Sequence, residues 1–204
     1  MKRETEIKSL IISNAIRLIA EGGFEKATTK ELAYSGGNLP DQKMNEVYIY
    51  RLFGSKEEVY EEAFLQLDRE LFSVIAKEEE AFDAMDGNIR ECLYDMFSRI
   101  WCFVVGNEER CRCYVRYYYS IYFKGKSFEA HQNRFNKMVV KMSHLFKEEA
   151  EVYAILHSVF IMLFDFSIRV YNGEIEDNDI NRPHIFNVLY CMMMTYFKDT
   201  PAIV

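Results

Sequence analysis

Residues that force a break in a helix are scarce in this chain. Its 204 residues include only three prolines and nine glycines, which favours long helices over a turn-rich β-fold. Half of the residues are apolar, 15% are aromatic and 28% are charged, a composition far from that of disordered chains. The length suits one domain of ordinary size, or one domain that carries a small second unit.

Signals of secretion and membrane insertion are also missing. The five cysteines are an odd number, which fits free thiols in a reducing compartment better than a disulfide framework. The first apolar stretch is interrupted by Asn14 and Arg17, unlike a secretory core. The most apolar segment, Val159 to Phe164 even when extended back to Val152, is shorter than the ~20 residues of a membrane span. We therefore expect a cytoplasmic protein with no membrane partner.

Motifs that would indicate an enzyme are absent. The sequence contains no His-Glu-x-x-His, Gly-x-Ser-x-Gly or Gly-x-Gly-x-x-Gly. Gly125-Lys126-Ser127 lacks the first glycine of a phosphate-binding loop, because Ser120 stands in its place. We expect no catalytic residue, cofactor or metal ion. A metal or redox role for Cys111 and Cys113, which have arginine neighbours, remains a minor alternative.

Helical periodicity and capping signals define the N-terminal part. Apolar residues recur every three or four positions from Ile7 to Ala20, and Gly22-Gly23 supplies a stop. Thr-x-x-Glu and Ser-x-x-Glu capping boxes at Thr28 and Ser55 predict a short helix over 29–34 and a long helix toward Phe82. Between them, Asp41 is a plausible N-cap of a short helix that ends at Phe53.

The rest of the chain repeats the same pattern without strand alternation. Turn residues separate helical segments, which we predict near residues 88–105, 108–123, 127–146, 148–171 and 181–198. The predicted fold is all-α, with about nine helices: three short ones, a connector and a bundle of five.

The order of the N-terminal elements is that of a helix-turn-helix head followed by a connector helix. In these residues the sequence resembles the tetracycline-repressor (TetR) family of bacterial transcription regulators. The resemblance covers roughly the first 65 residues. The matching residues are Ile12, Ala15, Ile16, Leu18, Ile19, Gly23, Phe24, Thr28, Thr29, Glu31, Leu32, Ala33 and the segment from Ile49 to Val59.

The resemblance implies a helix-turn-helix DNA-binding domain over residues 1–65 and a ligand-binding and dimerisation domain over 66–204. The chain departs from the family pattern in one place: the segment between Ala33 and Phe53 is several residues longer, and Gly36 to Gln42 replaces the usual turn. A longer turn would shift or lengthen the recognition helix, so the family's register of base contacts does not carry over directly.

Candidate DNA contacts follow from chemistry and from the resemblance. Hydroxyl and backbone N–H groups at a helix start can bind phosphate, and amide or cationic groups can read base edges. The family's phosphate-contacting positions correspond to Tyr50 and Lys56. The predicted DNA-binding residues are Thr28, Thr29, Lys43, Asn45, Tyr48, Tyr50 and Lys56, and Glu46 lies among them.

The net charge of −7 argues at first against nucleic acid, but its distribution matters. Residues 1–60 contain nine basic and nine acidic side chains, so the residues after them carry the whole net charge. A neutral head predicts modest, salt-sensitive affinity that depends on a dimer.

Aromatic residues and methionines concentrate after the head, where they suit a pocket for an apolar or aromatic ligand, and equally a plain core. The candidate ligand-binding residues are Trp101, Tyr117, Tyr118, Phe123, Phe135, Met138, His157, Phe160 and Phe164. The last two helices are apolar nearly all round, and in the family they form the dimer interface. The candidate interface residues are Phe160, Phe164, Phe186, Tyr190 and Met193.

We therefore expect a homodimeric transcription regulator, in the commoner family polarity a repressor, that binds a palindromic double-stranded DNA operator and is released by a small, largely apolar or aromatic effector. Two alternatives remain. One is a helical ligand-binding or interaction protein whose altered turn has weakened DNA binding, and the other is a helical enzyme.

Overall fold

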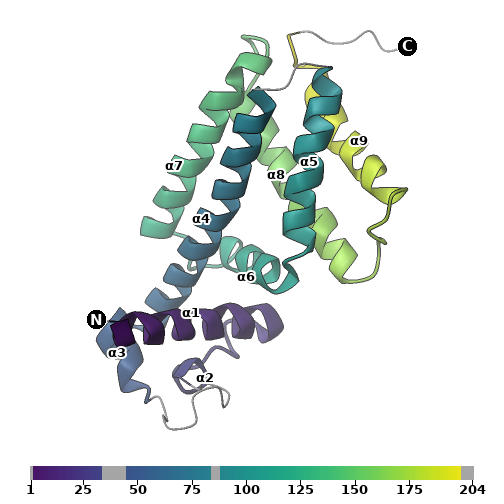
Figure 1. The fold of residues 1–204 in the computed structure, drawn as a ribbon. Coiled ribbons are helices and arrows are strands. Elements are labelled where there is room, and N and C mark those ends of the chain that lie inside the picture. Colours follow the sequence, from purple (N-terminus) through teal and green to yellow (C-terminus); the bar gives the residue numbers. More distant parts are fainter. Residues whose placement is uncertain (1, 34–44, 84–87, 199–204) are drawn as a thin grey trace. The chain divides into compact units, whose positions relative to one another are not determined.

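The computed structural model describes residues 2–33, 45–83 and 88–198. In these residues the chain forms nine α-helices and one 3₁₀-helix, and the only β-type pairing is an isolated bridge between Phe146 and Phe197. The helices are α1 (Lys2–Gly22), α2 (Thr29–Ala33), α3 (Val47–Phe53), α4 (Lys56–Asp83), α5 (Ile89–Val105), α6 (Glu108–Tyr118), α7 (Gly125–Met142), η1 (Ser143–Leu145), α8 (Val152–Tyr171) and α9 (Asn181–Met194). The all-α prediction is confirmed (Figure 1).

The predicted helix signals are found at the ends of the first helices. Gly23 has a φ of 76° and donates its N–H to the carbonyl of Ile19, which closes α1. The hydroxyl of Thr28 accepts from the N–H of Glu31, and the hydroxyl of Ser55 accepts from the N–H of Glu58. These bonds satisfy backbone donors that would otherwise be unpaired at the starts of α2 and α4. The predicted N-cap Asp41 lies outside the described residues.

Some helices are shorter than predicted. Helix α6 ends at Tyr118, because both the N–H and the hydroxyl of Ser120 bond to the carbonyl of Tyr117. The α7 segment tightens into the 3₁₀ turn η1 after Met142, and α8 begins at Val152, after a turn that the sequence had assigned to the helix.

The chain divides into two compact units, and α4 and α7 contribute residues to both. The first unit is residues 1–70 together with 107–131, so it contains the head, α6 and the first turns of α7. Helix α1 packs against α2 and α6, and the buried amide of Asn14 on α1 donates to the carbonyl of Leu32 on α2. The fully buried Tyr60 on α4 donates its hydroxyl to the carbonyl of Ala27, and burial raises its pKa to about 12. These contacts join α1, α2 and α6 with the start of α4 in one core.

The second unit is residues 71–106 together with 132–204, and its described core is built on α5, α8 and α9, which contact one another. The indole N–H of Trp101 on α5 donates to Asp177 in the α8–α9 loop, at 2.9 Å. Arg182 at the start of α9 also donates to this carboxylate, at 3.0 Å and 3.2 Å. The loop is therefore tied both to α5 and to α9.

Helix α8 corrects one expectation from the sequence. It runs for 20 residues because its turns continue past Asp165 to Tyr171, so by length and composition it could cross a membrane. Core helices of soluble proteins pass the same test, but only 28% of the tested stretch is buried in this structure. Most of the other residues of α8 are half-buried and five are exposed, so another surface could cover this side of the helix.

Candidate DNA-binding and ligand-binding sites

Helix α3 buries one face and presents the other to solvent. Ile49 and Phe53 point into the core of the first unit, whereas Val47 and Tyr50 are 61% and 57% exposed. The side chain of Asn45 accepts from the N–H of Val47, at 3.3 Å, and so helps to start the helix. The candidate DNA contacts Asn45, Tyr48 and Tyr50 are thus gathered on one short helix and its first turn, whereas Lys43 and the lengthened segment 35–42 lie outside the described residues.

The two threonines before and at the start of α2 have different partners. Thr28 caps α2 through the N–H of Glu31, at 3.2 Å. Thr29 donates its hydroxyl to the carboxylate of Glu46 at the start of α3, at 2.6 Å. Both hydroxyls therefore make contacts within the protein, and a phosphate would have to share or replace them.

Basic side chains of the head lie close to acidic ones. Lys56 is 3.9 Å from Glu57, and Arg51, which stacks on the ring of Tyr48 at 4.6 Å, is 3.9 Å from Glu4. Lys26 bonds Glu21 at 2.5 Å, and this bond lowers the pKa of that carboxyl. Exposed pairs of this kind are weak, so phosphates can displace the carboxylates.

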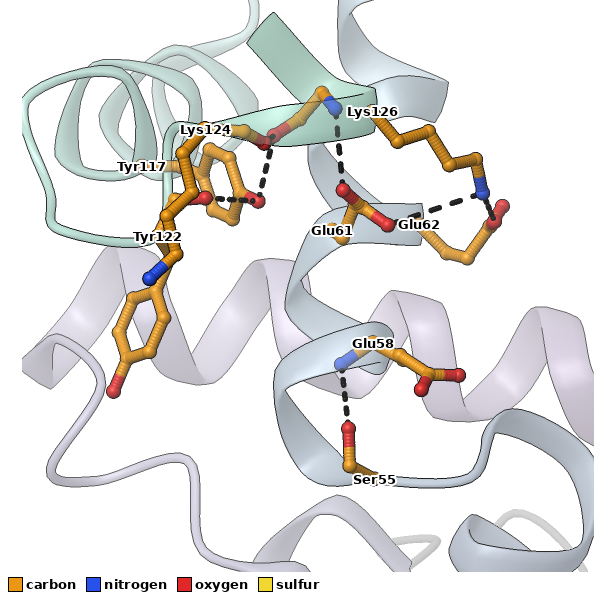
Figure 2. Close-up of polar contacts among 9 residues, drawn as sticks. Ser55, Glu58, Glu61, Glu62, Tyr117, Tyr122, Lys124 and Lys126 are labelled. Carbon is orange, nitrogen blue, oxygen red and sulfur yellow. Dashed lines mark hydrogen bonds and ion pairs between the residues drawn. The ribbon is translucent and has the colours of Figure 1, made fainter.

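The first turns of α4 hold the start of α7 through a polar network (Figure 2). Lys126 bonds Glu62 at 2.6 Å, which raises the pKa of the lysine, and the N–H of Ser127 donates to Glu61 at 3.1 Å. The hydroxyl of Tyr117 donates to the carbonyl of Tyr122, at 3.0 Å, and lies 3.1 Å from the hydroxyl of Ser127. A cleft of about 410 Å³ lies beside this network, lined by Lys8, Ile12, Leu52, Phe53, Glu58, Glu61, Glu62 and Lys126. Because lysine and glutamate side chains both line this cleft, its charge does not indicate one class of ligand.

Three of the candidate ligand-binding residues belong to the core of the first unit. The ring of Tyr117 stacks on Phe64 with centroids 4.6 Å apart, and Phe123 lies 5.3 Å from the same ring. Tyr118 packs edge-on to His131, at 5.3 Å. These aromatic residues join α6 and α7 to α4 within the first unit.

The same core contains a buried polar cluster that sequence reasoning missed. Asp68 and His131 are fully buried, and a carboxylate oxygen of Asp68 lies 2.8 Å from Nδ1 of His131. The hydroxyl of Tyr114 donates to that same oxygen at 3.0 Å. These residues lie far apart in the sequence, and no spacing rule connects them.

An apolar cavity of about 100 Å³ lies in the second unit. Its lining is Ile75, Leu93, Met96, Phe97, Ile100, Met138, Met142, Leu156, Val159, Phe160, Leu163, Phe186 and Met193. Met138 and Phe160 were predicted as ligand contacts and do line it. The spacing of Leu93, Met96, Phe97 and Ile100, three or four residues apart on α5, is the signal that could have identified more of the wall.

The remaining ligand candidates lie in the same unit but do not line the cavity. Phe135 packs on Phe160, at 5.6 Å, and on His157, at 5.7 Å, and Phe164 packs on Phe160 at 5.0 Å. Trp101 is fully buried and stacks on Phe97, at 5.7 Å. The indole therefore contacts Phe97, a residue of the cavity wall, without lining the cavity itself.

The five candidate interface residues are buried inside the protomer. Phe160, Phe164, Phe186, Tyr190 and Met193 all point into the core of the second unit, because α8 and α9 pack through these side chains on α5 and on each other. The residues of these helices that a partner can reach are different ones. The exposed stripe of α8 is Tyr153, Ala154, Ser158, Asp165 and Arg169. The exposed stripe of α9 is His184, Val188 and Cys191, and it continues at Thr195, directly after the helix.

The structure gives the Cys111 and Cys113 pair no metal-binding or reactive setting. Both are buried, and burial raises the pKa of the Cys113 thiol to about 12, so it stays protonated at neutral pH. Within the part of the chain that the structure describes, no group of three or more His, Cys, Asp or Glu side chains could hold a metal ion.

Comparison with known proteins identifies the fold. No protein-family model and no curated protein sequence matches the chain. Among solved structures, a TetR family transcription regulator from Marinobacter aquaeolei VT8 is similar with a TM-score of 0.73 at 16% identity, over 94% of this chain and 98% of that one. The regulator PfmR from Thermus thermophilus has a TM-score of 0.60 at 18% identity, over 89% and 96%.

The regulator FadR from Bacillus subtilis, solved in complex with stearoyl-CoA, has a TM-score of 0.58 at 16% identity, over 89% of this chain and 96% of that one. All three are transcription regulators, and each matches this chain over nearly its whole length. The fold that the sequence resemblance implied is thereby confirmed: the chain has the fold of the TetR-family transcription regulators.

Proposed function

We propose that this protein is a cytoplasmic, homodimeric transcription regulator of the TetR type that binds a palindromic operator and responds to an apolar effector. The observation that carries the proposal is the exposed surface of α3 and of the turn before it. The turn displays Asn45 and the helix displays Val47 and Tyr50, while the other face of α3 is buried in the head. A short second helix followed by an outward-facing third helix is the arrangement that places side chains in the major groove. Residues 1–65 form the DNA-binding domain in this proposal, and residues 66–204 bind the effector and the second copy.

DNA binding is tested by titrating the protein against DNA from upstream of its own gene at several salt concentrations. We expect sequence-preferring binding at low salt that Tyr50→Ala weakens about tenfold or more, because each well-placed contact contributes about 1–3 kcal/mol. Tyr119→Ala is the matched control, since Tyr119 is as exposed but lies on the α6–α7 loop. Binding without sequence preference, or none, would instead support a ligand-binding or interaction protein without an operator.

The effector proposed for the second unit is a hydrocarbon chain. Apolar side chains line the cavity, four of them methionines, and methionine adapts its shape to the ligand. A volume of about 100 Å³ is smaller than the roughly 150 Å³ cavity that holds benzene, so these side chains must move to admit a longer chain. The stearoyl-CoA complex of FadR gives a precedent on this fold.

The single tryptophan provides the readout for effector binding. Trp101 stacks on the cavity-lining Phe97, so a bound chain should change its fluorescence. We expect saturable changes with stearoyl-CoA and with fatty acids of increasing length, and their loss in Val159→Phe, which fills the cavity. Val140→Phe, at an exposed position of α7, is the control and should bind as wild type. Equal responses to free coenzyme A would contradict the proposal.

Dimerisation is proposed through the exposed stripes of α8 and α9. Their small residues Ala154, Ser158 and Cys191 would let two copies approach closely, and a second copy would cover Tyr153 and the half-buried apolar side chains of α8. Light scattering should show a dimer, and Val188→Asp should make it a monomer. In the dimer a maleimide should modify the exposed Cys102 faster than Cys191, and in Val188→Asp the two should react alike.

A further inference from the structure

Glu46 occupies an unusual place for an acidic residue. It lies at the start of α3, beside the side chains that we assign to DNA contact, and it is exposed. Its carbonyl accepts from the N–H of Ile49, which fixes its backbone to the helix, and its carboxylate accepts from Thr29 on α2, at 2.6 Å. The carboxylate is therefore held in one position by both helices of the helix-turn-helix.

A carboxylate at this position is repelled by phosphate and weakens non-specific binding to any DNA. The carboxylate can offset this loss of affinity only where a base presents a hydrogen-bond donor to it. In the major groove the amino group of cytosine is such a donor, whereas the amino group of adenine stands next to the N7 acceptor, which repels a carboxylate. Guanine and thymine present acceptors at the corresponding positions.

We infer that Glu46 is a specificity-determining residue, which accepts a hydrogen bond from the amino group of a cytosine in each half-site, and that Thr29 positions it. This inference rests on the proposed DNA-binding function. The Thr29 hydroxyl bonds one carboxylate oxygen, which leaves lone pairs on the carboxylate for the base. The same group then lowers affinity for other sequences and raises the preference for one.

The test is selection of bound sites from a random duplex library by wild type, Glu46→Gln and Glu46→Ala. Glutamine keeps an acceptor for Thr29 but pairs with adenine, so one C·G position in each half-site should change to A·T. Alanine should lose the preference at that position, about fivefold to tenfold. Glu25→Gln, which removes an equally exposed charge from the α1–α2 turn, is the matched control and should select the wild-type site.

Thr29→Val removes the donor and keeps the side-chain shape, so it should weaken the preference for C·G without changing its identity. Thermal melting of all variants excludes loss of folding as the cause. A wild type that selects no sequence would overturn the proposed function and this inference with it. A defined wild-type site that Glu46→Gln and Glu46→Ala both select unchanged would overturn the inference alone, and would leave the Thr29–Glu46 bond a purely structural tie.

Discussion

At the scale of single residues, the first unit contains the buried polar cluster of Asp68, Tyr114 and His131. Asp68 is fully buried, and the hydroxyl of Tyr114 and the ring of His131 both contact one of its oxygens. Removing a hydrogen-bond donor from a buried acceptor costs free energy, because the acceptor cannot exchange the lost bond for one to bulk water.

Tyr114→Phe removes only that hydroxyl. We expect it to lower the free energy of unfolding by about 1–3 kcal/mol, measured by urea denaturation followed by circular dichroism. Tyr50→Phe, at an exposed ring, is the control and should change stability by less than about 0.5 kcal/mol. Equal stability of the two variants would show that the Tyr114 hydroxyl contributes nothing.

The second unit has a carboxylate, that of Asp177, whose pKa is lowered by its hydrogen-bond donors. Burial opposes the charge of Asp177, but hydrogen bonds from Arg182 and Trp101 outweigh it, and the pKa of this carboxyl lies below its ordinary value of 3.8. A carboxyl with a lowered pKa in the folded state stabilises the protein above its unfolded pKa, and the stabilisation is lost as the pH falls through the folded value.

Asp177→Asn should therefore destabilise the protein most at neutral pH, by about 1–3 kcal/mol, because it removes a charged acceptor. The difference from wild type should stay constant down to about pH 5 and shrink below it. Urea denaturation at a series of pH values, followed by the fluorescence of Trp101, measures this. Asp95→Asn, at an exposed position of α5 outside the proposed dimer interface, is the control and should show a much smaller effect.

At the scale of elements, the turn between α3 and α4 fixes how α3 leads into α4. Gly54 has a φ of 93°, and a Cβ built there would lie 3.0 Å from a carboxylate oxygen of Glu58, whose N–H is capped by Ser55. Backbone strain and crowding therefore act at the same residue.

Gly54→Ala should lower the free energy of unfolding by about 1–3 kcal/mol and weaken DNA binding, because α3 shifts on α4. Gly173→Ala is the matched control: its φ of 73° is also left-handed, but no atom lies within 4 Å of the added Cβ. Gly173→Ala should thus be less destabilising in the same thermal melts and should bind DNA as wild type. If both variants behave alike, the contact with Glu58 has no effect.

Local signals in the sequence predicted where helices end, but not which face of a helix is buried. Caps and glycines predicted the ends of α1, α2 and α4 because those signals act within one turn of the chain. Ile185, Phe186, Leu189 and Tyr190 form the buried face of α9. Periodicity could not single out that face, because Val188, Cys191, Met192 and Met194 place apolar groups on the other sides of the helix. The interface prediction consequently named side chains that pack inside the protomer.

The residues predicted for the ligand pocket are divided between the two units, which the sequence could not show. Tyr117 and Phe135 are both buried aromatic residues in helices. Tyr117 lies in the first unit, whereas Phe135 lies in the second. Composition cannot separate two cores that share α4 and α7, because the apolar stripe of each helix keeps the same helical period in both units. The cavity and the Asp68 cluster are products of contacts between residues distant in the sequence.

At the scale of the whole molecule, charge distribution decides how the protein would use DNA. The first 60 residues are formally neutral, and described basic side chains of the head, such as Lys26, Arg51 and Lys56, stand next to carboxylates. In the proposed complex, a phosphate that binds one of these three side chains would have to compete with its carboxylate partner. One head would then make few phosphate contacts, and two heads on one DNA duplex would make twice as many.

This arrangement predicts the salt dependence of binding. The logarithm of the association constant should fall with the logarithm of salt concentration about twice as steeply for the wild-type dimer as for the Val188→Asp monomer, since the slope counts phosphate contacts. Glu4→Gln should free Arg51 and steepen the slope by about one contact per head, whereas Lys56→Ala should reduce it by a similar amount. Fluorescence anisotropy with labelled operator DNA measures all four proteins. Equal slopes for dimer and monomer would mean that a single head makes every phosphate contact, which contradicts a pair of heads reading a palindrome.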